Sequence, residues 1–122
     1  MQITTFNPMI LTSHADEVIA LFEALGFERK HKVDNIDQKD ITSVRMKDAN
    51  GFHVDVASSN HVPRDLTSIR INVDDFDEAY DFFMAHGFVN PRGDRITATS
   101  SSVDTYLVSP SGFAVTLCHH IK

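Results

Sequence analysis

The sequence predicts an α+β fold made of two tandem βαβββ modules. The first observation is an internal repeat: a shift of 61 residues, as from Gly26 to Gly87, aligns residues 7–27 with residues 68–88 without a gap. The second is apolar residues at helical spacing before the Gly-Phe pair at the end of each of these segments. The third is the alternation of apolar and polar residues that follows, which is typical of strands.

The first module is expected to begin with a strand over residues 3–12. A helix should follow, with Ser13 and Asp16 as a capping box and Gly26 at its end. Turn-like sequences, including residues 34–40 and 48–51, then separate three further expected strands. These strands are placed near residues 28–34, 41–47 and 51–58.

The second module repeats this order. A strand over residues 67–73 precedes a helix that Asp74 or Asp75 caps and Gly87 ends. Strands are then expected near residues 88–92, 95–108 and 112–119. We therefore predict one domain over residues 1–122, with modules at about 1–58 and 66–122 and a polar linker at about 59–65.

Alternation along the strands assigns their side chains to two faces. The apolar set should pack beneath the helices. It includes Phe52, Val54, Val56, Ile71, Phe113, Val115 and Leu117. The residues between them should therefore occupy the opposite face of the sheet. This polar face is expected to carry Asn7, His53, Asp55, Ser68, Arg70, Asn72 and Thr116.

Composition excludes several classes of protein. The net charge of −6 argues against nucleic acid as a partner, because phosphates require a basic surface. No apolar run is long enough to span a membrane, and no signal peptide is recognisable, so a cytoplasmic location is expected. A single cysteine, Cys118, excludes an internal disulfide and any site built on several thiolates.

The segments "HADEVIALFEALGF", "DFDEAYDFFMAHGF" and "SPSGFAVTL" resemble motifs of the vicinal oxygen chelate superfamily. This superfamily includes glyoxalase I, bleomycin-resistance proteins and extradiol dioxygenases. The resemblance covers nearly the whole chain. It implies that the modules form a curved, cup-like mixed β-sheet with the helices on its outer face, and that two chains form a homodimer.

The resemblance also implies where a metal would bind. The positions that hold His, Gln or Glu in metal-dependent members fall on Asn7, Asp55, Ser68 and Thr116. Only Asp55 is ionised, and this set suits a divalent transition metal poorly. We therefore expect no metal and no other cofactor, and we expect a small organic molecule as the ligand, as in the bleomycin-resistance proteins.

The remaining candidates are residues that would contact such a ligand. Arg70 is expected to pair with Asp55, and both should face the ligand together with His53. Arg45 and Tyr106, on equivalent strands of the two modules, are candidates for the walls of the cup. Tyr106 would stack on an aromatic ligand.

Two alternatives stay open at this point. One is a divergent lyase, isomerase or dioxygenase that uses Asp55 with or without a metal, or His53 and Asp55 as an acid–base pair. The other is an interaction module without catalysis. The sequence assigns no catalytic residue, so whether the protein is an enzyme is undecided.

Overall fold

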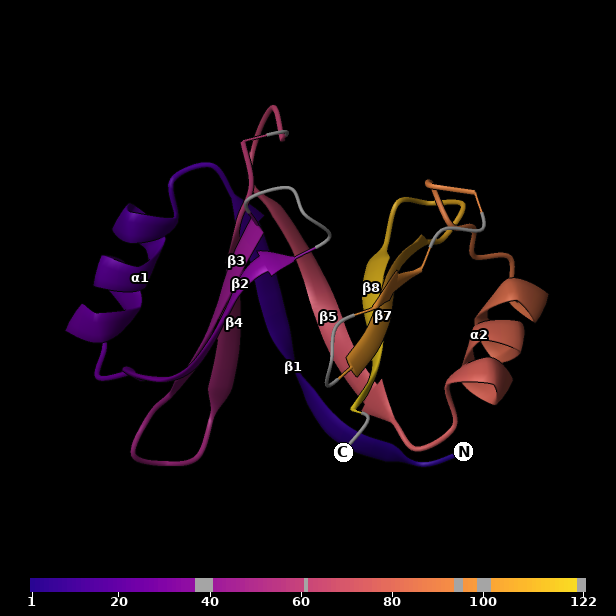
Figure 1. Cartoon of the computed structure of the whole chain (residues 1–122), viewed down its shortest axis with the longest axis horizontal. Coiled ribbons are helices and arrows are strands. Elements are labelled where there is room, and N and C mark those ends of the chain that lie inside the picture. Colours follow the sequence, from indigo (N-terminus) through magenta and orange to yellow (C-terminus); the bar gives the residue numbers. More distant parts are fainter. Residues whose placement is uncertain (37–40, 61, 94–95, 99–101, 121–122) are drawn as a thin grey trace. The chain divides into compact units, whose positions relative to one another are not determined.

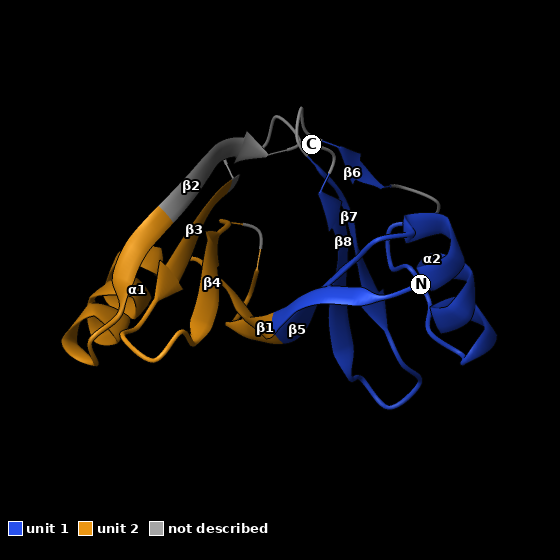
Figure 2. Ribbon diagram, turned by 90° about the horizontal axis from the view of Figure 1, so that it is seen from below, with its two compact units in different colours: residues 1–6, 68–122 blue, residues 7–67 orange. Residues whose placement is uncertain are grey.

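A computed structural model describes residues 1–36, 41–60, 62–93, 96–98 and 102–120. The chain forms two compact units, which Figure 2 shows in different colours. We call residues 7–67 the first module, and residues 68–122 together with residues 1–6 the second module. The first six residues were expected in the first module, but they join the second, where Gln2 and Asp74 exchange hydrogen bonds.

The first module contains one helix and a four-stranded sheet (Figure 1). The strands lie in the order β2-β3-β4-β1, with β4 parallel to β1 and the β2–β3 and β3–β4 pairs antiparallel. The elements are β1 (Ile3–Thr12, the first four residues of which lie in the second module), α1 (Ala15–Ala24), β2 (Glu28–Ile36), β3 (Ile41–Lys47) and β4 (His53–Ser58).

The second module has the same plan, with the strand order β5-β8-β7-β6. Strand β5 is parallel to β8, and the other two pairs are antiparallel. The elements are β5 (Leu66–Val73, the first two residues of which lie in the first module), α2 (Phe76–Ala85), β6 (Thr97–Ala98), β7 (Ser102–Val108) and β8 (Ala114–His120). Helix α2 and strand β7 lie 61 residues after α1 and β3, with the same lengths. The structure thus confirms two βαβββ modules in an α+β fold.

Each helix covers one face of its own sheet and buries a separate core there (Figure 1). In the first module Ile19 packs with Val44, Met46, Val54 and Val56. Burial of these side chains supplies most of the driving force for folding. The residues that alternate with them on β3 and β4 must therefore lie on the face without a helix.

The second core is built from the equivalent strands. Its buried members come from α2 and from three strands of the sheet. They are Ile71, Val73, Phe76, Ala79, Leu107, Val115 and Leu117.

The helix ends agree only partly with the expectation. Asp75 caps α2 by accepting a hydrogen bond from the Glu78 backbone N–H at 3.0 Å. The expected Ser13 capping box is wrong, because α1 begins after His14, whose side chain makes no capping hydrogen bond. Gly26 and Gly87 follow the helices with φ of 103° and 89°, a conformation that glycine adopts without the steric cost of a Cβ.

The apolar pattern overstated burial at several positions. Phe52 and Phe113 precede their strands and are largely exposed. Leu21 on α1 and Leu25, the residue after the helix, are also largely exposed. In place of the expected strand at 88–92, a single bridge joins Val89 to Val108. Some expected features lie outside the described residues. They are residues 37–40 of the expected turn at 34–40, residue 61 of the linker, and residues 95 and 99–101 of the expected 95–108 strand.

The helices of the described residues are too short and too polar to cross a membrane.

Candidate functional site

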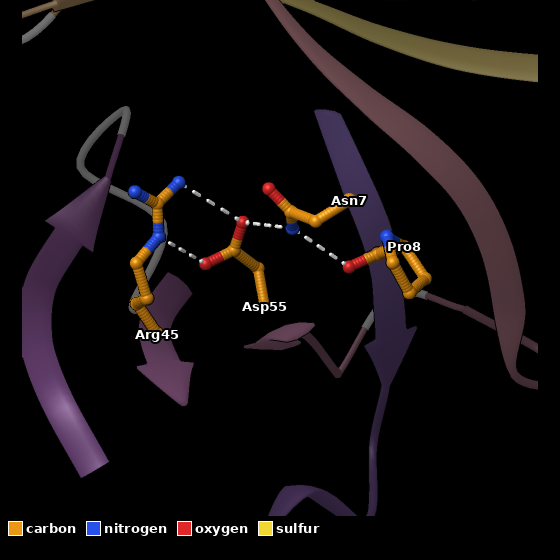
Figure 3. A network of polar contacts seen from close by, with 4 residues as sticks. All are labelled: Asn7, Pro8, Arg45 and Asp55. Atoms are coloured by element: carbon orange, nitrogen blue, oxygen red, sulfur yellow. Dashed lines mark hydrogen bonds and ion pairs between the residues drawn. The ribbon is translucent and has the colours of Figure 1, made fainter. Parts of the chain in front are cut away.

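The helix-free face of the first module carries a network centred on the Asp55 carboxylate (Figure 3). Asp55 lies on β4 between Val54 and Val56, whose side chains enter the core on the other face. Its side chain is 0% exposed. A buried carboxylate requires partners that replace its hydration, and two residues of the same module supply them.

The first partner is Asn7 on β1. Its Nδ2 donates to Asp55 Oδ2 at 2.9 Å and to the Pro8 carbonyl at 3.0 Å. Strand β1 runs parallel to β4, with Met9 directly opposite Asp55, so Asn7 reaches Asp55 from the adjacent position on the same face. Two of the positions that the resemblance assigned to metal ligands are thus bonded to each other.

The second partner is Arg45, directly opposite Asp55 in the β3–β4 hairpin. Its Nε lies 3.1 Å from Oδ1 and its Nη2 lies 3.5 Å from Oδ2. The two carboxylate oxygens therefore contact the Nε–Nη2 edge of the planar guanidinium, and this contact orients the Arg45 side chain. Among the described residues no hydrogen bond uses Nη1, and the Arg45 side chain is 21% exposed.

The pairing of Arg45 with Asp55 was missed by the sequence analysis, which placed Arg45 separately on a wall. The turn at 48–52 could have predicted that the two residues are neighbours. A hairpin around it places Lys47 opposite His53 and therefore Arg45 opposite Asp55. The expected pairing of Arg70 with Asp55 concerns residues of different modules and stays a prediction. The alternative of His53 and Asp55 as an acid–base pair likewise stays a prediction.

The second module has an equivalent pair of neutral hydroxyls. Ser68 Oγ and Thr116 Oγ1 are 2.7 Å apart and buried. They stand 61 residues after Asn7 and Asp55, so both modules join the same two positions by a hydrogen bond. Thr116 lies between Arg70 on β5 and Tyr106 on β7 in the register of the sheet. Tyr106 is half-buried, and loss of solvation raises its pKa above 10.0.

These residues do not fit a divalent transition metal. Each module contributes two of the implied positions, and of the four side chains only Asp55 is a carboxylate. Its oxygens already accept hydrogen bonds from Asn7 and Arg45, and the hydroxyls of Ser68 and Thr116 are weak neutral ligands. In the described part of the chain, no three His, Cys, Asp or Glu side chains are grouped so as to hold a metal ion.

Two hollows lie at the N-terminal ends of the helices. The first, of about 490 Å³, is lined by residues 13–17 at the start of α1 and by Val44 and Val56. The second, of about 410 Å³, is lined by residues 74–77 at the start of α2 and by Val103. Because Val44 and Val56 also line the core beneath α1, the first hollow and Asp55 lie on opposite faces of the sheet.

Comparison with known proteins identifies the fold. No protein-family model and no curated protein sequence matches the chain. Solved structures do match, at low sequence identity. A glyoxalase/bleomycin resistance protein/dioxygenase superfamily member from Vibrio splendidus 12B01 has a TM-score of 0.61 and 16% identity, over 97% of this chain and 99% of that protein.

Two further matches are methylmalonyl-CoA epimerases. The enzyme from Mycobacterium tuberculosis has a TM-score of 0.69 and 13% identity, over 96% of this chain and 88% of its own. A variant of the Streptomyces coelicolor enzyme, in complex with 2-nitronate-propionyl-CoA, has a TM-score of 0.65 and 17% identity, over 97% and 98%. The chain therefore has the fold of the vicinal oxygen chelate superfamily, which its repeated motifs resemble.

Proposed function

We propose that this protein binds a small organic molecule without a metal, on the helix-free face of the first module. Proteins of this fold carry out unrelated functions, so the proposal rests on the residues of the site. The observation that carries it is the engagement of Asp55 by Arg45 and Asn7. A carboxylate that serves as the counter-ion of a guanidinium is a poor ligand for a metal and a good positioning group for an arginine.

The chemistry of Arg45 indicates what kind of ligand fits. Nη1 offers N–H donors and no acceptor, so its partner must be an oxygen or another hydrogen-bond acceptor. Because Asp55 already neutralises Arg45, the pair selects for acceptor geometry more than for a negative charge. The ligand should therefore present a carbonyl or carboxylate oxygen. The apolar side chain of Met9 flanks Asp55 on the side away from Arg45, in the same row of the sheet.

Thermal-shift and calorimetric measurements with a panel of small ketones, amides and carboxylates test this proposal, with and without Ni²⁺, Zn²⁺, Fe²⁺ and Mn²⁺. At least one compound should bind in the absence of metal. Arg45→Lys keeps the charge but loses the planar fork, and should weaken binding about tenfold. Lys47→Gln, at an exposed position two residues along the same strand, is the matched control and should bind normally.

Three results would overturn the proposal. The first is stoichiometric metal uptake by the purified protein that Asp55→Thr abolishes. The second is a panel in which nothing binds, and the third is a panel in which Arg45→Lys binds as tightly as the wild type and the Lys47→Gln control. The same samples test the enzymatic alternative. If the wild type turns over a hemithioacetal and Asp55→Thr does not, the protein is an enzyme and the proposal of a purely binding function is wrong.

A further inference from the structure

One buried side chain in the second module has an unmet hydrogen-bonding capacity. Asn72 on β5 is 0% exposed, and neither its Oδ1 nor its Nδ2 has a hydrogen-bond partner within the described part of the chain. An amide presents two donors and a carbonyl acceptor. Buried polar groups are nearly always paired, because burying them unpaired is destabilising.

Asn72 lies on the helix-free face of the second sheet. Its neighbours along the strand, Ile71 and Val73, pack into the core beneath α2, so the Asn72 side chain projects from the other face. Across the sheet it lies opposite Cys118 on β8, which is opposite Asp104 on β7. The next row on this face holds Arg70, Thr116 and Tyr106.

The internal repeat shows that the fold does not require an amide at this position. The equivalent residue of the first module, 61 positions earlier, is Leu11, which occupies the same place in the register of its sheet opposite Ala57. The two modules share strand order and pairing, yet one has an aliphatic side chain where the other has an unpaired amide. The amide therefore has a role other than packing.

We propose that Asn72 binds the amide edge of a small neutral ligand, such as a lactam or a carboxamide. The side chain presents its carbonyl oxygen and its N–H side by side, and a cis-amide edge presents the complementary N–H and carbonyl oxygen. Two hydrogen bonds would then satisfy both orphaned atoms at once. A ketone or a carboxylate satisfies only the donor, and a hydrocarbon satisfies neither.

The amide atoms are covered in this conformation, so the ligand reaches them only when a neighbouring side chain moves. This inference uses residues of the second module and does not depend on the Arg45–Asp55 site. The two proposals can therefore fail independently.

The experiment compares δ-valerolactam with cyclohexanone, which has the same ring size but lacks the N–H. Nuclear magnetic resonance of the ¹⁵N-labelled protein follows the side-chain NH₂ resonances of Asn72, identified by their loss in Asn72→Leu. The lactam should shift these resonances at least several-fold more than the ketone at equal concentration. Asn72→Leu should weaken lactam binding about tenfold or more.

The repeat supplies the controls. Asn72→Leu installs the residue of the first module, so it should fold, and its melting temperature should equal or exceed that of the wild type. Leu11→Asn places an amide at the equivalent position, and should lower the melting temperature without affecting lactam binding. Asn72→Thr is a second variant. It shortens the side chain and removes the carbonyl oxygen and N–H that the amide presents side by side, so it should also bind the lactam poorly.

The inference is overturned if lactam and ketone shift the Asn72 resonances equally, or if Asn72→Leu binds the lactam as the wild type does. A lower melting temperature for Asn72→Leu would also overturn it, because the amide would then stabilise the fold. If the lactam is not recognised at Asn72 but ligands with a carbonyl or carboxylate oxygen still bind at Arg45, only this inference is contradicted. The reverse result would contradict the proposed function alone.

Discussion

Asn7 and Asp55 are joined by a 2.9 Å hydrogen bond, and Ser68 and Thr116, their equivalents 61 residues later, are joined by one of 2.7 Å. The two modules thus keep the same cross-strand contact with different chemistry. In the first module the contact belongs to a charged network that includes Arg45. In the second it is a pair of neutral hydroxyls beside Tyr106. This difference leads to contrasting predictions for equivalent substitutions.

Arg45→Tyr installs the residue that the second module has at this position. Alone, it should destabilise the protein by about 3–5 kcal/mol, because it breaks the ion pair between the Arg45 guanidinium and the buried Asp55 carboxylate. Adding Asn7→Ser and Asp55→Thr converts the network to the set found in the second module, and should recover most of the loss. Urea unfolding of the single and triple variants measures this difference. Equal stability of the two variants would show that the ion pair does not account for the effect.

The hydroxyl pair of the second module should respond more weakly. Thr116→Val leaves the buried Ser68 hydroxyl without this partner and should cost about 1–3 kcal/mol. Combining it with Ser68→Ala should cost less than the sum of the two single changes, since both partners are then removed. The control is salt dependence: added salt should leave the Thr116→Val effect unchanged. Strict additivity in the double-mutant cycle would argue against the hydrogen bond.

Tyr106 should make stability depend on pH in the alkaline range. Its pKa is raised by burial, so the folded state holds the phenolic proton more tightly than the unfolded state. The contribution is fully present below pH 10.0, the unfolded value, and is lost as pH rises through the folded pKa. The measurement is a pH titration of tyrosinate absorbance for the wild type and for Tyr106→Phe. The difference between the two curves reports Tyr106, and its midpoint should lie above pH 10.0. A midpoint at or below that value would contradict the burial of this ring.

A capping residue at the start of α1 should stabilise the protein. His14 stands where the second module has Asp75, which caps α2 through the Glu78 N–H. His14→Asp should therefore add about 1 kcal/mol by supplying the missing acceptor, and Asp75→Ala should remove a similar amount. Chemical denaturation of both variants measures the two effects. His14→Ala is the control, because it changes the side chain without adding a cap, and it should leave stability nearly unchanged.

The sequence by itself determined the repeat, and with it most of the fold. Helical spacing placed α1 and α2, the Gly-Phe pairs marked their ends, and alternation placed Asp55 and Thr116 on the face opposite the cores. These features are readable because each depends on residues close together in the chain. Burial of Phe52 was wrongly predicted for the same reason. The apolar alternation extends one residue before the start of β4, and Phe52 at that position is largely exposed.

Only the tertiary structure decided which side chains pair. Asp55 bonds to Asn7, 48 residues earlier, and no sequence pattern predicts that contact. The turn at 48–52 places Arg45 opposite Asp55, but only the structure shows that the two side chains bond. The unpaired state of Asn72 is likewise invisible in the sequence, where it reads only as a polar residue on a strand. Hydrogen bonds depend on ångström-scale distances and on angles between residues remote in sequence. Periodicity fixes the face on which a residue lies, whereas folding fixes its partners.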